Sequence, residues 1–142
     1  MHYPLIISLF VSVIFLISCD PTATDEPKIF AGHEWNASAG VVADTTSLFK
    51  ANDVIVIQMD NGKPFFAPEV EFRVYQGEVG DRVLFKRAIP VRNTDNRATI
   101  KGPESKPVTA REIFRTSTPG FYRVAFAIGD SVLLEKKLEL AK

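Results

Sequence analysis

The sequence predicts an all-β protein, a sandwich of two antiparallel sheets built from seven to nine short strands. Apolar and polar side chains alternate after residue 28, as at Val70, Phe72 and Val74, and this period of two fits a strand and not a helix face. Turn residues such as Asp60-Asn61-Gly62 separate the runs. We find no internal repeat, and short, evenly spaced strands favour a sandwich.

The strand signals follow one another along the chain. Residues 54–59 are a β-branched run suited to a central strand. The runs 70–75 and 83–91 come next and are separated by a turn at 77–81. The last third predicts a hairpin around Gly129-Asp130, with the apolar residues of its second strand sharing one face: Val132, Leu134, Leu138 and Leu140.

The secondary structure of residues 107–115 is ambiguous between a helix and a strand. They are long enough for a single helical turn, but Val108, Ala110 and Phe114 also suit the alternation of a strand. We therefore predict a strand there and no helix in the sandwich.

The first twenty residues read as an export signal. Residues 5–17 are apolar apart from two serines, and no charged side chain precedes Asp20. As a helix, residues 5–18 would span about 21 Å, short of the roughly 30 Å hydrocarbon core of a bilayer. The length therefore favours a signal peptide, residues 1–18, over a membrane span.

The apolar run ends in Leu16-Ile17-Ser18-Cys19, which resembles the lipobox of bacterial lipoproteins. The resemblance implies that Ser18 precedes the cleavage site and that the Cys19 thiolate takes a diacylglyceryl group, with the freed amino group acylated, for example by palmitate. More than one acyl chain is what stable anchoring requires. The alternative, a buried structural Cys19, fits poorly with the Asp20-Pro21 that follows.

This reading divides the chain into three parts: the signal peptide, a lipidated cysteine and flexible tether at 19–27, and a sandwich domain at 28–142. The tether has no apolar residue larger than Ala. We expect a membrane-anchored protein of the bacterial cell envelope. An acidic residue after the cysteine marks inner-membrane retention in some bacteria and outer-membrane or surface delivery in others, and we favour the outer membrane.

The stretch Pro119-Gly120-Phe121-Tyr122-Arg123-Val124 resembles the G-x-Y-x-C start of strand F in immunoglobulin-like sandwiches, with Val124 in place of the cysteine. The resemblance implies an immunoglobulin-like antiparallel β-sandwich with a structural corner at Gly120 and Tyr122, whose hydroxyl bonds nearby backbone. Residues 49–140 are similar to immunoglobulin-like modules of bacterial lipoproteins.

Charge is unevenly distributed. The whole chain has 17 basic and 17 acidic residues, yet residues 19–81 have 4 basic and 11 acidic, and residues 82–142 have 13 and 6. One interpretation is a basic face for an anionic polymer or acidic partner, made of Arg82, Lys86, Arg87, Arg92, Arg97, Lys101, Arg111 and Arg115. The other, which we favour, is that acidic and basic strands are neighbours and their charges cancel locally. Nucleic acid is not an expected partner of an envelope protein without net positive charge.

Three aromatic residues are candidate contacts. Trp35 follows Gly32-His33-Glu34, in a segment that otherwise reads as a solvated loop or edge strand. Phe65 and Phe66 are adjacent, so on a strand they point to opposite faces and at least one can be exposed. The plainer interpretation is a bulge or an edge strand that ends at Pro68.

The inventory of residues argues against catalysis. After export only His33 remains of the two histidines, which excludes a multi-histidine metal site, and no carboxylate lies in an apolar setting that would raise its pKa. We expect no metal and no cofactor. The predicted function is a non-catalytic binding or assembly module with an envelope protein or glycan as partner. The alternatives are a small enzyme acting on envelope polysaccharide and a basic-face binder of anionic polymer.

Overall fold

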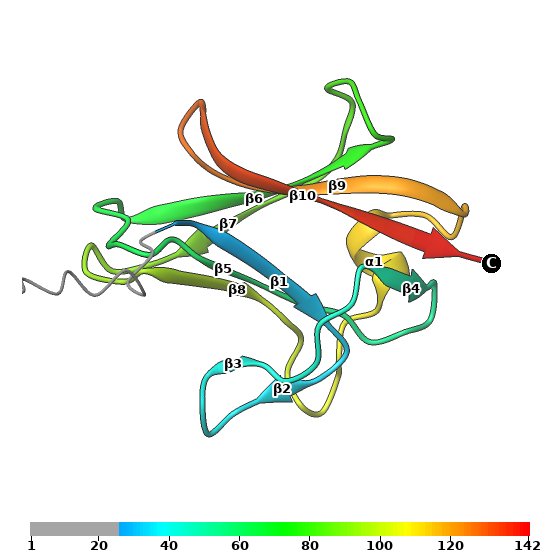
Figure 1. The fold of residues 1–142 in the computed structure, drawn as a ribbon, viewed down its shortest axis with the longest axis horizontal. Coiled ribbons are helices and arrows are strands. Elements are labelled where there is room, and N and C mark those ends of the chain that lie inside the picture. Colours follow the sequence, from blue (N-terminus) through cyan, green and yellow to red (C-terminus); the bar gives the residue numbers. More distant parts are fainter. Residues whose placement is uncertain (1–25) are drawn as a thin grey trace, which may run out of the picture.

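The computed structural model describes residues 26–142, and the predicted signal peptide, Cys19 and most of the tether lie outside them. The described residues form an all-β sandwich with one short helix (Figure 1), so the predicted fold class is confirmed. They contain ten strands where seven to nine were expected, because a small ladder of β2 (Trp35–Asn36) and β3 (Val41–Val42) adds to the eight others.

The other strands are β1 (Lys28–Gly32), β4 (Leu48–Lys50), β5 (Val56–Asp60), β6 (Glu69–Gln76), β7 (Val83–Pro90), β8 (Arg97–Ile100), β9 (Gly120–Ile128) and β10 (Ser131–Ala141). They form a three-stranded sheet in the order β1-β5-β8 and a five-stranded sheet in the order β4-β10-β9-β6-β7. The strand pairings of the described residues are antiparallel, except that β4 runs parallel to the end of β10. In Figure 1 the three-stranded sheet lies below the five-stranded one.

The core lies between these two sheets. β5 is the central strand of the smaller sheet and is buried up to its last residue. In the larger sheet, the rings of Phe72 on β6 and Phe126 on β9 lie 5.3 Å apart between centroids, and both side chains are fully buried. Because residues 26–142 contain no cysteine, the stability of the fold depends on this burial of apolar side chains.

The sandwich is open along both sides, and each opening carries an inward-facing cation. On one side, Arg87 of the edge strand β7 lies opposite the buried Phe72 and so shares its core-facing side. On the other side, Lys136 of β10 lies opposite the buried Val124, in the part of β10 that β4 leaves unpaired. Inward-pointing charges at a sheet edge discourage pairing with another chain.

The strand predicted over residues 107–115 is wrong, because α1 (Ala110–Phe114) is a helix there. The Glu112 carboxylate accepts hydrogen bonds from the backbone N–H of Thr109, at 2.8 Å, and from its hydroxyl, at 3.1 Å. Thr-x-x-Glu is a sequence signal for the start of a helix. The apparent alternation of Val108, Ala110 and Phe114 concealed it. No helix in residues 26–142 is long and apolar enough to cross a membrane.

The chain enters β9 through a corner held by Tyr122. Gly120 has φ 149°, in the region that favours glycine, and the Tyr122 hydroxyl donates a hydrogen bond of 2.6 Å to the carbonyl oxygen of Thr118. The Tyr122 ring stacks on Phe114 of α1, with 5.0 Å between centroids. The corner therefore joins β9 to the helix.

A β-bulge corrects the prediction for β10. Its register with β9 shifts between Val132 and Leu134, and an extra residue in one strand moves the side chains on either side of it out of phase. Val132 is 45% exposed, whereas Leu138 and Leu140 are buried. Leu134, Leu138 and Leu140 therefore share the core-facing side, as predicted, and Val132 does not.

Candidate functional site

The structure divides the predicted basic face. Lys86 and Arg87 are consecutive on β7, so their side chains point to opposite sides of the sheet. Arg82 is exposed just before β7. Arg92 lies in the loop after it and pairs with Asp95, with Nη2 and Oδ1 3.2 Å apart. The four cations therefore do not form one surface.

The other predicted cations are also dispersed. Arg97 at the start of β8 pairs with Asp60, with Nε and Oδ2 3.2 Å apart. Arg115 is the residue that follows α1. Its guanidinium carbon lies 4.7 Å from the ring centroid of Phe85. We favoured local cancellation of acidic and basic charges over a basic face. The ion pairs of Arg92 and Arg97 agree with that interpretation.

Arg87 meets two lysines at the opening between β7 and β8. A hollow of about 200 Å³ is lined there by Arg87, Lys101 and Lys106. Glu112 also lines it, but the hydrogen bonds from Thr109 lower the pKa of its carboxyl group and hold it at the helix start. Among the described residues, none of the three cations forms an ion pair. The hollow is therefore a place of positive charge.

Lys101 links this opening to Trp35. A second hollow, of about 230 Å³, shares Lys101 with the first and is also lined by His33 and Trp35. The Lys101 Nζ lies 5.6 Å from the centroid of the Trp35 ring. One continuous surface therefore contains Trp35, Arg87, Lys101 and Lys106, and we call it the Trp35–Arg87 surface. Lys106 was not among the predicted cations, and nothing local in the sequence brings these four residues together.

His33 fixes the loop that carries Trp35. Its Nδ1 lies 3.0 Å from Oδ2 of Asp44, and its Nε2 lies 3.5 Å from Oδ2 of Asp53. The other oxygen of Asp44 accepts hydrogen bonds from the backbone N–H groups of His33 and Glu34. Burial alone would raise the pKa of Asp44, but the hydrogen bonds from Glu34 and His33 outweigh it and lower the pKa. The carboxylate thus stays charged and holds the loop in place.

Phe65 and Phe66 lie in the loop between β5 and β6, not in a strand. Phe65 is buried, whereas Phe66 is 75% exposed. Phe66 has φ 53°, a left-handed conformation that bulky residues rarely adopt, at a cost of about 1–3 kcal/mol. Its N–H donates to the carbonyl oxygen of Asn93, just before β8, whereas Lys101 follows the end of β8. Phe66 and the Trp35–Arg87 surface are therefore at opposite ends of that strand.

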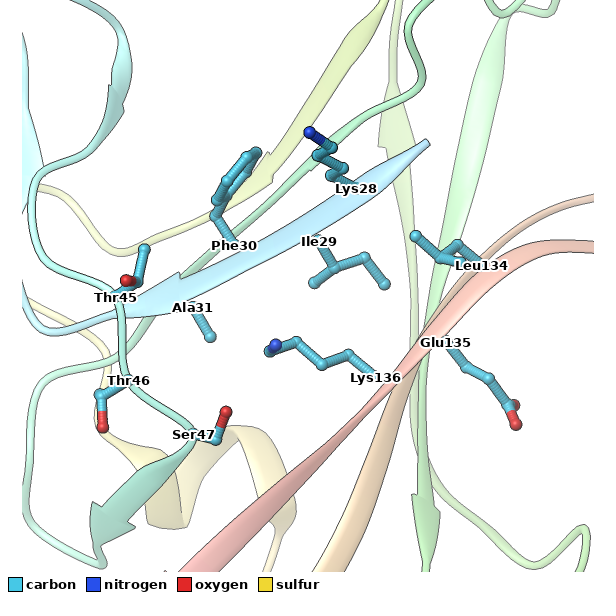
Figure 2. A pocket seen from close by; sticks show the side chains of 10 residues that line it. All are labelled: Lys28, Ile29, Phe30, Ala31, Thr45, Thr46, Ser47, Leu134, Glu135 and Lys136. Atoms are coloured by element: carbon cyan, nitrogen blue, oxygen red, sulfur yellow. The ribbon is translucent and has the colours of Figure 1, made fainter. Parts of the chain in front are cut away.

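A third hollow, of about 580 Å³, lies between β1 and β10. Figure 2 shows the Lys136 side chain reaching across this hollow toward Ala31 and Ser47. The apolar side chains of Ile29 and Leu134 also line the hollow. The backbone N–H of Thr46 donates to the carbonyl oxygen of Ala31 at 2.8 Å. This bond occupies one backbone acceptor near the end of β1. The sequence offered no signal for this hollow, because its walls come from three distant segments.

Metal-ligating and carboxylate side chains are sparse around the hollows of residues 26–142. No group of three possible metal-ligating side chains gathers in residues 26–142. Each of the three hollows is lined by a single carboxylate, Glu112, Glu104 or Glu135. They offer shape and positive charge to a ligand.

The comparisons with known proteins concern the fold. An immunoglobulin-like protein from Pseudomonas aeruginosa is 14% identical, with 82% of this chain and 90% of that chain covered and a TM-score of 0.47. The soluble domain of PmoD from Methylocystis sp. ATCC 49242 (Rockwell) is 9% identical, with 81% and 90% covered and a TM-score of 0.45. No family model and no curated protein matches this chain. Similarity at this level says nothing of a ligand.

Proposed function

We propose that this chain is a lipoprotein of the bacterial envelope, anchored through acylated Cys19, and that its sandwich is a non-catalytic module that binds an acidic glycan. The sequence supports the anchor through an apolar run that ends in Leu16-Ile17-Ser18-Cys19. The sandwich then follows after a tether of eight residues, 20–27. The Trp35–Arg87 surface supports the binding role.

The observation that carries the choice of ligand is the combination of three unpaired cations with one accessible aromatic ring. The Arg87 guanidinium offers a planar fork of N–H donors that matches a carboxylate or phosphate, and Lys101 and Lys106 add mobile point charges. Trp35 offers a flat apolar face with a polar edge. An acidic glycan presents the complementary pair, anionic groups and the apolar faces of sugar rings, along one chain.

The lining of the hollows supports binding without cleavage. Hydrolysis of a glycosidic bond ordinarily needs two carboxyl groups on either side of the scissile bond. The hollow at Arg87 contributes Glu112 alone, and the hollow at Trp35 contributes Glu104 alone. We therefore propose binding, and not hydrolysis, as the function of this surface.

A second candidate partner is an acidic protein segment, favoured by the open edge of β7. The N–H of Val91 donates to the carbonyl oxygen of Pro68 on the β6 side. In an antiparallel pair, every second residue bonds to the partner strand and the residues between them point their N–H and C=O groups outward. The backbone N–H and C=O groups of Lys86 and Ala88 therefore point away from β6. A partner can add a strand at such an edge. Pro90 and Lys86 would discourage pairing with a second copy of β7.

Changing Arg87, Lys101 and Lys106 together to glutamine is expected to weaken binding of polygalacturonate by about tenfold to a hundredfold, because each change removes a charge-assisted contact. Isothermal titration at fixed ionic strength measures the affinity, with neutral dextran as the ligand control. Dextran is expected to bind weakly to both proteins.

The matched control changes Lys50, Lys137 and Lys142 to glutamine, which removes the same charge on and after β4 and β10, away from β7. This variant is expected to bind within about twofold of the parent protein. An equal loss in both variants would mean that overall charge attracts the polymer. Binding of an acidic peptide in place of polygalacturonate would favour the edge of β7.

A further inference from the structure

The exposed side chain of Phe66 lies at the end of the sandwich where the chain enters it. Lys28, the first residue of β1, pairs with Asp60 at the end of β5, and Asp60 pairs with Arg97 at the start of β8. The loop that carries Phe66 follows Asp60 directly, and it is bonded to the loop that precedes Arg97. Figure 1 shows both loops at its left-hand end, beside the start of β1.

We infer that Phe66 inserts into the surface of the membrane that holds the protein, and so docks this end of the sandwich on the bilayer. This inference rests on the proposed anchor at Cys19. Eight residues separate Cys19 from Lys28, and even fully extended they place Lys28 within about 30 Å of the anchored residue. The end of the sandwich that carries Phe66 is therefore the end nearest the lipid.

The loop displays Phe66 and does not merely leave it exposed. Its neighbours Phe65 and Ala67 are both buried, while Phe66 is 75% exposed. The backbone at Phe66 is held in a left-handed conformation, and the N–H of Phe65 donates to the carbonyl oxygen of Asp95 at 2.8 Å. Strained backbone that the surrounding fold maintains is a feature of functional sites. An exposed apolar side chain such as Phe inserts at the boundary between headgroups and acyl chains.

One aromatic side chain suffices here because the anchor supplies proximity. A short linker keeps the second contact at an effective concentration in about the millimolar range, so a weak interaction is occupied for much of the time. The charges at this end do not favour anionic lipid. Arg92 and Arg97 are paired with Asp95 and Asp60. The two exposed lysines Lys28 and Lys63 are matched in number by two exposed carboxylates, Glu26 and Glu69. The contact is therefore expected to be apolar.

The test uses the fluorescence of a single tryptophan in the full chain, expressed in bacteria and reconstituted into phosphatidylcholine vesicles that contain brominated lipid. Trp35 is the only tryptophan, so a Trp35→Phe, Phe66→Trp variant reports from the tip alone. The matched variant, Trp35→Phe with Phe121→Trp, reports from a partly exposed position beside Gly77, at the other end of β6.

The tryptophan at 66 is expected to lose about half of its emission or more to the brominated lipid, since an interfacial side chain reaches the acyl boundary, while the one at 121 keeps its emission. Sedimentation of the protein with the vesicles reports the anchor separately. Sedimentation without quenching at 66 would overturn the docking and leave the anchored module standing. No sedimentation would overturn both.

Two further results bear on the nature of the contact. Quenching is expected to stay the same at about 0.5 M salt, where surface charges are screened. Quenching that appears only after anionic lipid is added to the vesicles, and that disappears in salt, would show that cations make the contact, against the inference. A blue-shifted emission at 66 without vesicles, together with a dimer in analytical centrifugation, would make Phe66 a protein interface and also overturn it.

Discussion

Replacing Phe126 with alanine is expected to lower the free energy of unfolding by about 3–5 kcal/mol, the usual cost of deleting a buried phenyl group. Phe126 is fully buried on β9, its ring packs against Phe72, and Phe72 in turn contacts Phe85. The change therefore opens a cavity where β9, β6 and β7 are joined. Since domains of this size have about 5–15 kcal/mol of stability, a large part of the total is lost. Chemical denaturation followed by circular dichroism measures it.

Phe121→Ala on the same strand is the matched control. Phe121 is 40% exposed, and its ring lies 4.8 Å from Nζ of Lys137, so its removal leaves no internal cavity. Its cost is expected to be about 1 kcal/mol or less. Equal costs at the two positions would contradict the placement of the core between the sheets.

Replacing Gly32 with alanine is expected to cost about 2–4 kcal/mol, since overpacking and lost hydrogen bonds add together. A Cβ at Gly32 would overlap the backbone carbonyl oxygen of Asp44, and it would lie 2.7 Å from Cγ1 of Val42 and 2.8 Å from Oδ1 of Asp44. The end of β1 or the segment that carries Asp44 must move. The hydrogen bonds of that carboxylate to His33 and Glu34 are then disturbed.

Gly40→Ala separates this collision from the general cost of changing a glycine. Gly40 has φ +66°, and no atom lies within 4 Å of the place that an alanine methyl group would take there, so only backbone strain of about 1–2 kcal/mol is expected. Trp35, the only tryptophan, reports the loop by fluorescence. A Gly32→Ala protein with the stability and emission of the Gly40→Ala protein would show that the Asp44 segment is not packed on Gly32.

The sequence reveals the strands whose side chains alternate in burial and conceals elements governed by other signals. β6 and β9 follow the period of two because one face of each packs on the core. α1 escaped detection because its buried residues Ala110, Ile113 and Phe114 resemble a broken alternation, while the Thr109-x-x-Glu112 cap carries the helical information. The bulge at Val132 changes register without any turn residue to mark it.

The candidate site was only partly predictable, for a physical reason. Trp35 and Arg87 were identified singly, from residue type and from the local excess of positive charge. Their association through Lys101 depends on how β2, β7 and the segment after β8 meet in the sandwich. Such contacts are set by the packing of the two sheets, and no short window of sequence contains them.

The most direct measurement is the intact mass of the native protein recovered from the membrane fraction. We expect a chain that begins at Cys19 and carries a diacylglyceryl group and an additional acyl chain on that residue. Because Cys19 is the only cysteine, no thiol should then react with a maleimide. An unmodified full-length chain, or a free thiol on protein found in the cytosol, would contradict it.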